Sequence, residues 1–248
     1  HAPRTALRPT WMKTSAMTIL DADKLAALDP AEVRDRKPFP WLHVEKLITD
    51  QGYRRLLDSL PDKSEFDRIY GKRRPGGQKP HNRYALQYKP WKSYPEPWAE
   101  LIAELNGPLY KNFVANVVGH NKFLLHCHWH YTPVGCSVSP HTDAPWKYGS
   151  HIFYLNTEDD WDEAWGGNTV VLDDGGRFKV RSAPKFEDFD REISAPSMGN
   201  RSLFFARNDH SWHGVKELNC PEDKLRKVFI VEIRKPDPIM ALRTRLGF

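Results

Sequence analysis

The sequence has few cysteines and no long apolar run. Its three cysteines, Cys127, Cys136 and Cys220, are too few and too irregularly spaced for a disulfide framework or a zinc cluster. No apolar stretch approaches the roughly 20 residues that a membrane-spanning helix needs. The first residues also lack the charged-then-apolar order of a secretory signal. We therefore expect a cytoplasmic protein with reduced thiols and no membrane partner.

Acidic residues are absent from one segment of the chain. From Arg68 to Lys92 there are eight Lys or Arg residues and no Asp or Glu. The net charge of the whole chain is only +5, so the remainder is close to balanced. A nucleic-acid-binding domain usually clusters its excess charge over one face or helix. The sequence therefore does not favour nucleic acid as a partner. The excess charge is confined to this segment, so we look for its role there.

The composition is that of one packed domain. The chain has 248 residues, of which 40% are hydrophobic and 12% aromatic, enough for a substantial core. Residues 1–16 show no periodicity, and we interpret them as a disordered extension or a cloning remnant. We expect residues 17–248 to form a single domain, with a helical part over 17–120 and a strand-rich core over 121–235.

Hydrophobic periodicity predicts helices first and strands after them. Apolar spacing predicts an amphipathic helix over 44–60, capped by Thr49 or Asp50, and further helices over 96–105 and 109–118. From Phe123 onward, short runs of aromatic and β-branched residues end in Gly, Pro, Asn or Asp. They predict strands over 123–131, 150–155, 168–172, 202–205 and 228–233. We interpret 175–200 as an insertion between strands. The fold class is α+β.

Two short motifs carry ligand-type side chains. In His141-Thr142-Asp143, two such residues at i and i+2 of an extended backbone point to the same side. His213 lies in Ser211-Trp212-His213-Gly214-Val215, between two predicted strands. Two histidines and one carboxylate on one face of an octahedral iron leave open positions for a co-substrate and O₂. A His-x-Asp pair alone is a weak signal, because it is frequent by chance.

The order and spacing of several motifs resemble those of the 2-oxoglutarate oxygenases of the prolyl-hydroxylase type. The resemblance covers residues 123–233 with one insertion. It consists of Tyr131, ten residues before His141; the His141-x-Asp143 pair; Ile152-Phe153-Tyr154-Leu155-Asn156; Asp160-Trp161-Asp162 and Gly166-Gly167; Pro196-Ser197-Met198-Gly199 before Leu203-Phe204-Phe205; His213-Gly214-Val215; and Arg226 at the start of the last strand.

The resemblance implies a fold, a metal site and a co-substrate site. The fold would be a double-stranded β-helix, or jelly-roll, buttressed by the N-terminal helices. Fe(II) would be bound by His141, Asp143 and His213. The distal carboxylate of 2-oxoglutarate would meet Arg226, whose guanidinium suits a carboxylate, with Tyr154 and Tyr131 as further lining residues. Arg226 follows His213 by thirteen residues, a long interval that a loop through 219–221 would explain.

The resemblance also implies an enzyme. The reaction would couple oxidative decarboxylation of 2-oxoglutarate by O₂ to hydroxylation of an unactivated C–H bond, with release of succinate and CO₂ and with ascorbate as a candidate reductant. The presence of Asp143 argues against halogenation but leaves desaturation and ring closure open. We expect a small anionic molecule or amino-acid derivative as substrate. The alternatives are a peptidyl prolyl-type hydroxylase and a non-catalytic jelly-roll protein that binds metal or 2-oxoglutarate.

Other histidines compete for the metal. His210 precedes His213 by three residues, but the His-Gly-Val match favours His213. His126, His128 and His130 alternate along one predicted strand and share a face. If the neighbouring Tyr131 points into the pocket, these three histidines point away, so a second metal site is not favoured. By the same alternation, Lys227 beside Arg226 is expected to face solvent.

The basic segment 68–92 combines turn-forming Pro and Gly with cations and aromatic residues. In enzymes of the resembling family, a mobile segment just ahead of the β-core closes over the iron. We predict that 68–92 is such a lid and that Arg73, Arg74 and Arg83 favour an anionic substrate. The alternative is a solvated loop whose charge only aids solubility.

Overall fold

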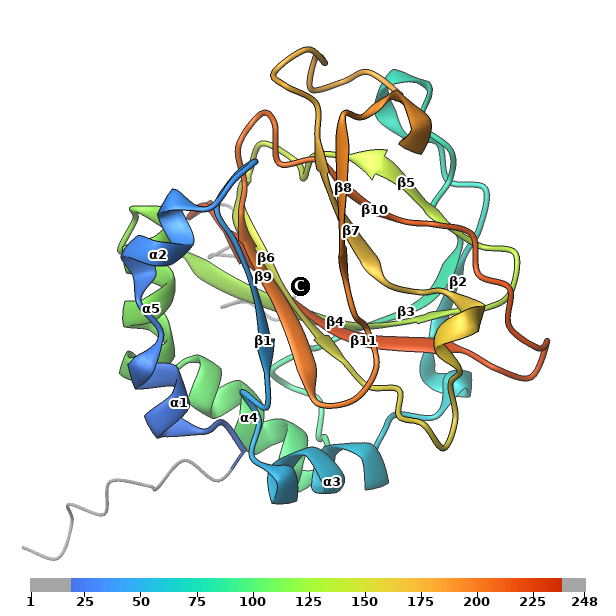
Figure 1. Ribbon diagram of the computed structural model, residues 1–248. Helices are drawn as coiled ribbons and strands as arrows, with labels where there is room; N and C mark the ends of the chain where they lie inside the picture. Colours follow the sequence, from blue (N-terminus) through green and yellow to red (C-terminus); the bar gives the residue numbers. More distant parts are fainter. Residues whose placement is uncertain (1–18, 238–248) are drawn as a thin grey trace, which may run out of the picture.

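The computed structural model describes residues 19–237, so the predicted extension over 1–16 lies outside the described residues. Two antiparallel sheets face each other, and helices cover one of them (Figure 1). The helices are α1 (Ala22–Ala27), α2 (Pro30–Asp35), α3 (Asp50–Asp58), α4 (Glu96–Leu105) and α5 (Pro108–Val118). The strands are β1 (Trp41–Glu45), β2 (Asp67–Ile69), β3 (Arg83–Gln87), β4 (Leu124–Thr132), β5 (Val138–His141), β6 (Lys147–Tyr154), β7 (Thr169–Asp173), β8 (Arg191–Ala195), β9 (Arg201–Ala206), β10 (His213–Val215) and β11 (Arg226–Arg234). Short 3₁₀ turns lie at Lys63–Glu65, Pro75–Gly77, Glu163–Trp165 and Phe186–Asp188.

The larger sheet has seven strands in the order β1-β9-β6-β11-β4-β3-β2, and the smaller has four in the order β5-β10-β7-β8. Every named pair is antiparallel. This arrangement confirms the predicted α+β jelly-roll. In the described part of the chain, no helix is long and apolar enough to cross a membrane.

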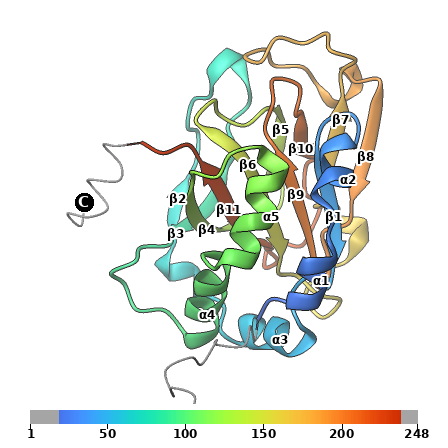
Figure 2. The ribbon, with the colours of Figure 1, turned by 90° about the vertical axis from the view of Figure 1, so that its left-hand side faces the viewer.

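Strand alternation gives the larger sheet two differently occupied faces. One face carries Trp129 and Phe229, which pack against Trp98 of α4; α4 and α5 lie along this side in Figure 2. The opposite face carries Tyr154 and Val228, which form a second cluster with residues of the smaller sheet. The interior between the two sheets is therefore the space in which a site can form.

The predicted helix over 44–60 is only partly correct. Residues 41–45 form strand β1, and the helix begins at Asp50, with the Thr49 hydroxyl accepting a hydrogen bond from the Gly52 amide at 3.0 Å. Strand β1 pairs with β9, some 160 residues further along the chain. Local apolar spacing does not reveal so distant a partner, and tertiary pairing overrides it.

Two other predictions are corrected. The predicted helical part also contains β2 and β3, which extend the larger sheet beyond β4. The predicted insertion over 175–200 contains β8, which pairs with β7 along its full length. In both cases the strand lies at or near a sheet edge. Edge strands carry a weaker apolar signal, because less of each strand is buried.

The segment that was predicted as a lid lies against the loop between β7 and β8. Gly76 has a φ of +69°, and a Cβ built on it would meet the carbonyl oxygen of Arg181. The Gln78 amide donates a hydrogen bond to the Ser182 carbonyl at 3.2 Å. The backbone therefore approaches closely at a position where glycine is needed.

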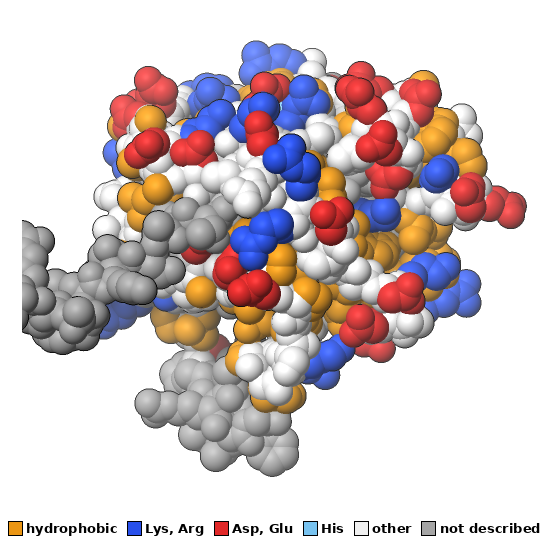
Figure 3. All heavy atoms as spheres, turned by 90° about the horizontal axis from the view of Figure 1, so that it is seen from below, with side chains coloured by type: hydrophobic (Ala, Val, Ile, Leu, Met, Phe, Trp, Pro, Cys, Tyr) orange, Lys and Arg blue, Asp and Glu red, His pale blue; other side chains and the backbone are white. Residues whose placement is uncertain are grey.

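The excess of basic residues in that segment does not continue over the rest of the molecular surface. On the face seen from below, acidic and basic side chains are interspersed (Figure 3). Interspersed charge is typical of a solvated surface rather than of a nucleic-acid-binding face.

Candidate functional site

Three buried ligand-type residues meet where β5 ends and β10 begins. His141 is the last residue of β5, His213 is the first of β10, and the two are paired across the strands. Their ring centroids lie 4.4 Å apart. Asp143 follows β5 by two residues, and one ligand atom from each of the three residues lies within 4.8 Å of the others. We call this group the triad.

Backbone contacts set the tautomer of both histidines. Nδ1 of His141 donates to the Ser139 carbonyl at 2.9 Å, and Nδ1 of His213 donates to the Ser211 carbonyl at 3.0 Å. Each ring therefore leaves Nε2 unprotonated when neutral. Burial lowers the pKa of both histidines, and for His141 the nearby His213 acts in the same direction. Neutral imidazoles with a free Nε2 are the form that binds a metal.

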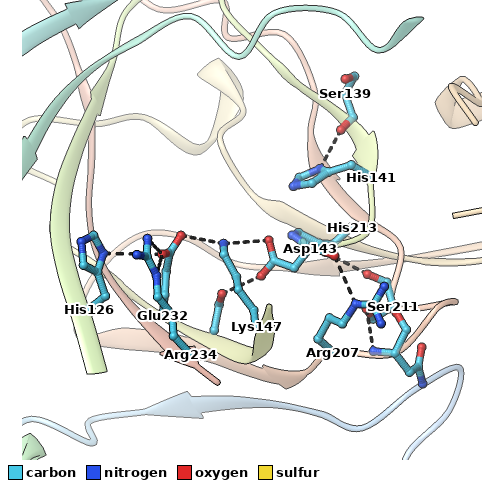
Figure 4. Close-up of polar contacts among 12 residues, drawn as sticks. His126, Ser139, His141, Asp143, Lys147, Arg207, Ser211, His213, Glu232 and Arg234 are labelled. Carbon is cyan, nitrogen blue, oxygen red and sulfur yellow. Dashed lines mark hydrogen bonds and ion pairs between the residues drawn. The ribbon is translucent and has the colours of Figure 1, made fainter. Parts of the chain in front are cut away.

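Asp143 is charged and held from three sides. Its carboxylate accepts hydrogen bonds from Lys147 Nζ at 3.0 Å and from Ser150 Oγ at 2.7 Å, while Arg207 Nε donates to its backbone carbonyl at 3.2 Å. Burial alone would raise the pKa of Asp143, but Lys147 and its other partners outweigh this effect and lower it. Figure 4 shows Lys147 between Asp143 and Glu232, which its ammonium contacts at 2.6 Å.

The triad fits a divalent metal that prefers mixed nitrogen and oxygen ligands. It offers two imidazoles and one carboxylate, the donor set of the facial triad of non-haem Fe(II) oxygenases. His210 is not part of the group: its side chain is 45% exposed, and its Nδ1 contacts Asp174 at 3.0 Å. The structure thus brings together the three residues that the sequence predicted and leaves His210 outside.

A second buried site lies between β11 and β7. Arg226 Nε donates to the Gly167 carbonyl, and its Nη2 donates to Thr169 Oγ1 at 3.2 Å. The Tyr154 hydroxyl donates to the same Thr169 oxygen at 2.9 Å. Within residues 19–237, no carboxylate forms an ion pair with Arg226. Burial lowers the pKa of this guanidinium, so it lies in an environment that favours an added anion.

The two sites share one interior. The Phe205 ring lies 4.4 Å from that of His213 and packs in the same cluster as Tyr154. Thr169, which the sequence analysis missed, has a recognisable signal. It lies in a predicted strand two residues before Val171, and alternation places both on the interior face.

The prediction that Tyr131 lines the co-substrate site is wrong. Tyr131 lies on the helix-covered face, stacked on Phe66 at 4.2 Å, and its hydroxyl donates to the Pro61 carbonyl at 3.0 Å. Lys227, its partner on β11, forms an ion pair with Asp160 at 2.7 Å and is only partly exposed. Arg226 faces the interior because it is one residue out of phase with both.

Because Tyr131 faces the helices, the histidines of β4 face the interior, which is the opposite of the prediction. His128 and His130 stack at 4.4 Å on the interior face, and burial lowers the pKa of His128 to about 3. His126, His128 and Glu232 lie close enough to hold a metal. However, Lys147 and Arg234 already neutralise Glu232, and two cations beside it disfavour a third.

The structure separates the three arginines predicted to meet the substrate. Arg73 is exposed, whereas Arg74 and Arg83 are partly buried. Both are near His81, whose ring centroid lies 4.8 Å from that of His141. Burial, followed by the charges of Arg74 and Arg83, lowers the pKa of His81 to about 3. The structure therefore brings Arg74 and Arg83 towards the triad and leaves Arg73 exposed.

Comparisons with known proteins agree with this geometry. A family model of the 2OG-Fe(II) oxygenase superfamily matches residues 117–231. A prolyl-4-hydroxylase of Pseudomonas putida is 15% identical, with a TM-score of 0.56 over 84% of this chain and 98% of its own. A prolyl hydroxylase of Trichoplax adhaerens, solved with a peptide fragment of the oxygen degradation domain of hypoxia inducible factor, is 12% identical, with a TM-score of 0.59 over 92% of this chain and 94% of its own. The carbocyclase SnoK from nogalamycin biosynthesis is 12% identical, with a TM-score of 0.55 over 86% of each chain. No curated protein matches by sequence. At these identities the solved structures show a shared fold.

Proposed function

We propose that the protein hydroxylates an unactivated C–H bond of a small anionic molecule or amino-acid derivative, as the match of residues 117–231 to the 2OG-Fe(II) oxygenase superfamily supports. The protein is a dioxygenase that uses Fe(II), 2-oxoglutarate and O₂. The choice of substrate and the roles of individual residues are the proposed part.

We assign iron binding to His141, Asp143 and His213. Their protonation supports this role, because both imidazoles present a free Nε2 and Asp143 is charged. When bound there, iron would activate O₂ for the coupled oxidation of 2-oxoglutarate and substrate. The protein's own contribution is orientation: Ser139 and Ser211 fix the rings, and Lys147 and Ser150 fix the carboxylate.

The observation that carries the proposal is that Arg226 is buried and has no acid partner among residues 19–237. Its guanidinium, the Tyr154 hydroxyl and Thr169 meet in the interior that also contains the triad. A buried cation is stabilised by an anion that forms charge-assisted hydrogen bonds with it. The distal carboxylate of 2-oxoglutarate would supply that anion, held by Arg226 and Tyr154. A protein that only binds metal has no use for this arrangement.

A peptidyl prolyl-type hydroxylase is the second candidate. It is favoured by the likeness to the Trichoplax enzyme, whose structure contains a peptide. The likeness to SnoK, an enzyme named for the biosynthesis of a small molecule, favours the first. Both reactions use the same triad and the same clamp, so they differ only in what lies at the mouth of the site.

The test is succinate release that depends on Fe(II), 2-oxoglutarate and O₂. In Arg226→Gln the KM for 2-oxoglutarate should rise by a factor corresponding to about 2–5 kcal/mol, the cost of breaking a buried charge-assisted pair. In Tyr154→Phe one hydrogen bond is lost, and the effect should be about 1 kcal/mol. Arg201→Gln is a matched control, because Arg201 has Glu45 as an acid partner at 3.0 Å and lies at the start of β9.

Two results would contradict the proposal. An unchanged KM in Arg226→Gln would move the co-substrate clamp to other residues. Tight binding of metal and 2-oxoglutarate with no succinate under any condition would make the protein a non-catalytic binder.

A further inference from the structure

The arginines of the described chain differ in whether they have an acid partner. Seven of them are not exposed. Four of these seven, Arg55, Arg201, Arg207 and Arg234, form an ion pair with a carboxylate. The other three are Arg226, Arg74 and Arg83, for which the described residues offer no carboxylate within 4.0 Å. Arg226 is explained by the proposed co-substrate, and the other two need an explanation of their own.

Within the described part of the chain, the hydrogen-bond acceptors of Arg74 and Arg83 are all neutral. Arg74 Nε contacts Gln78 Oε1 at 3.3 Å. Arg83 Nε contacts His130 Nε2 at 3.2 Å, and its Nη1 donates to the His81 carbonyl at 2.8 Å. A guanidinium has five N–H donors, so most donors of Arg74 and several of Arg83 are available to a ligand.

Both guanidiniums lie beside the triad. His81 connects them to it, since its ring packs on that of His141 and its Nε2 contacts Ser139 Oγ at 3.1 Å. Arg74 acts electrostatically on His141 and His213 as well as on His81. Residues this near to the proposed metal ligands are in a position to contact the molecule that would be oxidised there.

The charges of this region do not balance internally. The two nearby carboxylates, Asp143 and Glu232, are both bound by Lys147. Arg74 and Arg83 are close enough to repel each other, and burial together with this repulsion lowers the pKa of Arg74. Asp143 acts favourably on Arg74 and Glu232 on Arg83, but among residues 19–237 neither arginine has a carboxylate in direct contact, so an anion that binds both would stabilise them.

The backbone holds Arg74 in this position. Gly76 meets the backbone of Arg181, and Gln78, which accepts from Arg74, is itself bonded to the Ser182 carbonyl. On the other side, Arg83 opens strand β3, which pairs with β4. One guanidinium therefore comes from the docked segment and the other from the first residue of a sheet strand.

We propose that Arg74 and Arg83 together form a subsite for an anionic group, a carboxylate or a phosphate, on the molecule that is hydroxylated. This inference rests on the proposed function for the identity of the ligand as substrate. The exposed Arg73, which adjoins Arg74 in sequence, takes no part. The anionic group lies near the triad, so the oxidised C–H bond belongs to the same small part of the substrate as the anion.

The first experiment measures anion binding without turnover. Protein loaded with Mn(II) and 2-oxoglutarate, which fill the metal and clamp sites, is titrated with sulfate, with chloride at matched ionic strength as reference. Thermal unfolding reports binding, because a ligand of the native state raises Tm. Sulfate should raise Tm in the parent and in Arg73→Gln. In Arg74→Gln and Arg83→Gln its dissociation constant should rise at least tenfold.

The Tm values of the same variants in chloride, without sulfate, distinguish an anion subsite from a merely structural role of the two arginines. If the two arginines form an anion subsite, removing either relieves repulsion, and Tm in chloride should stay the same or rise. A structural role predicts a lower Tm in chloride and an unchanged sulfate response. The proposal is overturned by that result, by no sulfate effect in the parent beyond that of chloride, or by equal sulfate effects in all four proteins.

The second experiment tests whether Arg74 and Arg83 bind the substrate or the co-substrate 2-oxoglutarate. The dissociation constant of 2-oxoglutarate for the Mn(II) protein and its substrate-free decay with Fe(II) should be within twofold of the parent in both variants. A tenfold weaker affinity for 2-oxoglutarate would assign the arginines to the co-substrate and overturn the proposal. A parent that binds sulfate through Arg74 and Arg83 but releases no succinate would instead refute the proposed function, with the anion subsite intact.

Discussion

Replacing Lys147 by methionine should destabilise the metal-free protein much more than the metal-loaded one. The ammonium contacts Asp143 at 3.0 Å and Glu232 at 2.6 Å, and its side chain is only 14% exposed. Methionine keeps the apolar stem but removes the charge. Two buried carboxylates, one of them in the triad, are then left without their shared cation.

The magnitude follows from these distances. At an effective dielectric constant of about 20, a unit charge pair at about 3 Å is worth roughly 5 kcal/mol before desolvation. Breaking a buried pair by removing one partner costs about 3–5 kcal/mol in practice, and we expect this loss for the metal-free protein. A divalent cation at the triad supplies positive charge to the same Asp143 carboxylate. The metal-loaded variant should therefore lose at least about 1.4 kcal/mol less, which corresponds to an apparent metal affinity about tenfold higher.

The assay is denaturant unfolding with and without Mn(II), together with a Mn(II) titration of the native variant. Lys46→Met is the matched control. Lys46 and Asp50 form the same i, i+4 pair at 3.1 Å, but their side chains are 65% and 61% exposed, so its loss should cost less than about 1 kcal/mol. A Lys147→Met protein as stable as Lys46→Met, or equally destabilised with and without metal, would refute the reasoning.

Two further predictions concern the triad and the docked segment. Alanine at any one of the three triad positions should abolish Fe(II)-dependent succinate release with little loss of secondary structure by circular dichroism, whereas His210→Ala should keep more than about half of the activity; a reversed pattern would place the metal elsewhere. Gly76→Ala should detach the segment from Arg181, because a Cβ there meets the Arg181 carbonyl and alanine is strained at a positive φ. Limited proteolysis within 71–80 should then become faster, and the free energy of unfolding should fall by about 1–2 kcal/mol. An unchanged cleavage rate would contradict the docking.

The triad was predicted through the resemblance to the oxygenase family, because only part of its geometry is local. His141 and Asp143 are two residues apart in the sequence, and His213 lies between two predicted strands. This spacing gives His141 and Asp143 a shared direction, whereas His213 meets them only through the pairing of β10 with β5. Their assignment as iron ligands nevertheless stays a prediction until metal binding is measured.

The position of Tyr131 was not predictable from its distance to His141. Its face is set by alternation along β4, where Trp129 and Tyr131 share the side that the helices cover. A ten-residue interval that includes a loop does not preserve this phase. Applying alternation from Trp129, a large residue expected in the main core, would have given the correct face.

Arg73 and Arg74 show a second limit. They are adjacent in a Pro- and Gly-containing segment without periodicity, so the sequence gives them equal weight. Their difference arises from the docking of Gly76 and Gln78 against residues 181–182, about 100 residues further along the chain. The same limit applies to β1, whose partner β9 is distant.

The central place of β11 has a consequence for how the chain folds. This strand is the last in sequence among the described residues, yet it lies between β6 and β4 and pairs with both along most of its length. A nascent chain that ends before Arg226 has the two halves of the larger sheet without the strand that joins them. Such pairing is non-local, and non-local sheets close slowly. Until β11 arrives, the facing edges of β4 and β6 expose unpaired backbone groups to other chains, so we expect aggregation during synthesis to depend more on release of this last strand than on any residue of the mature surface.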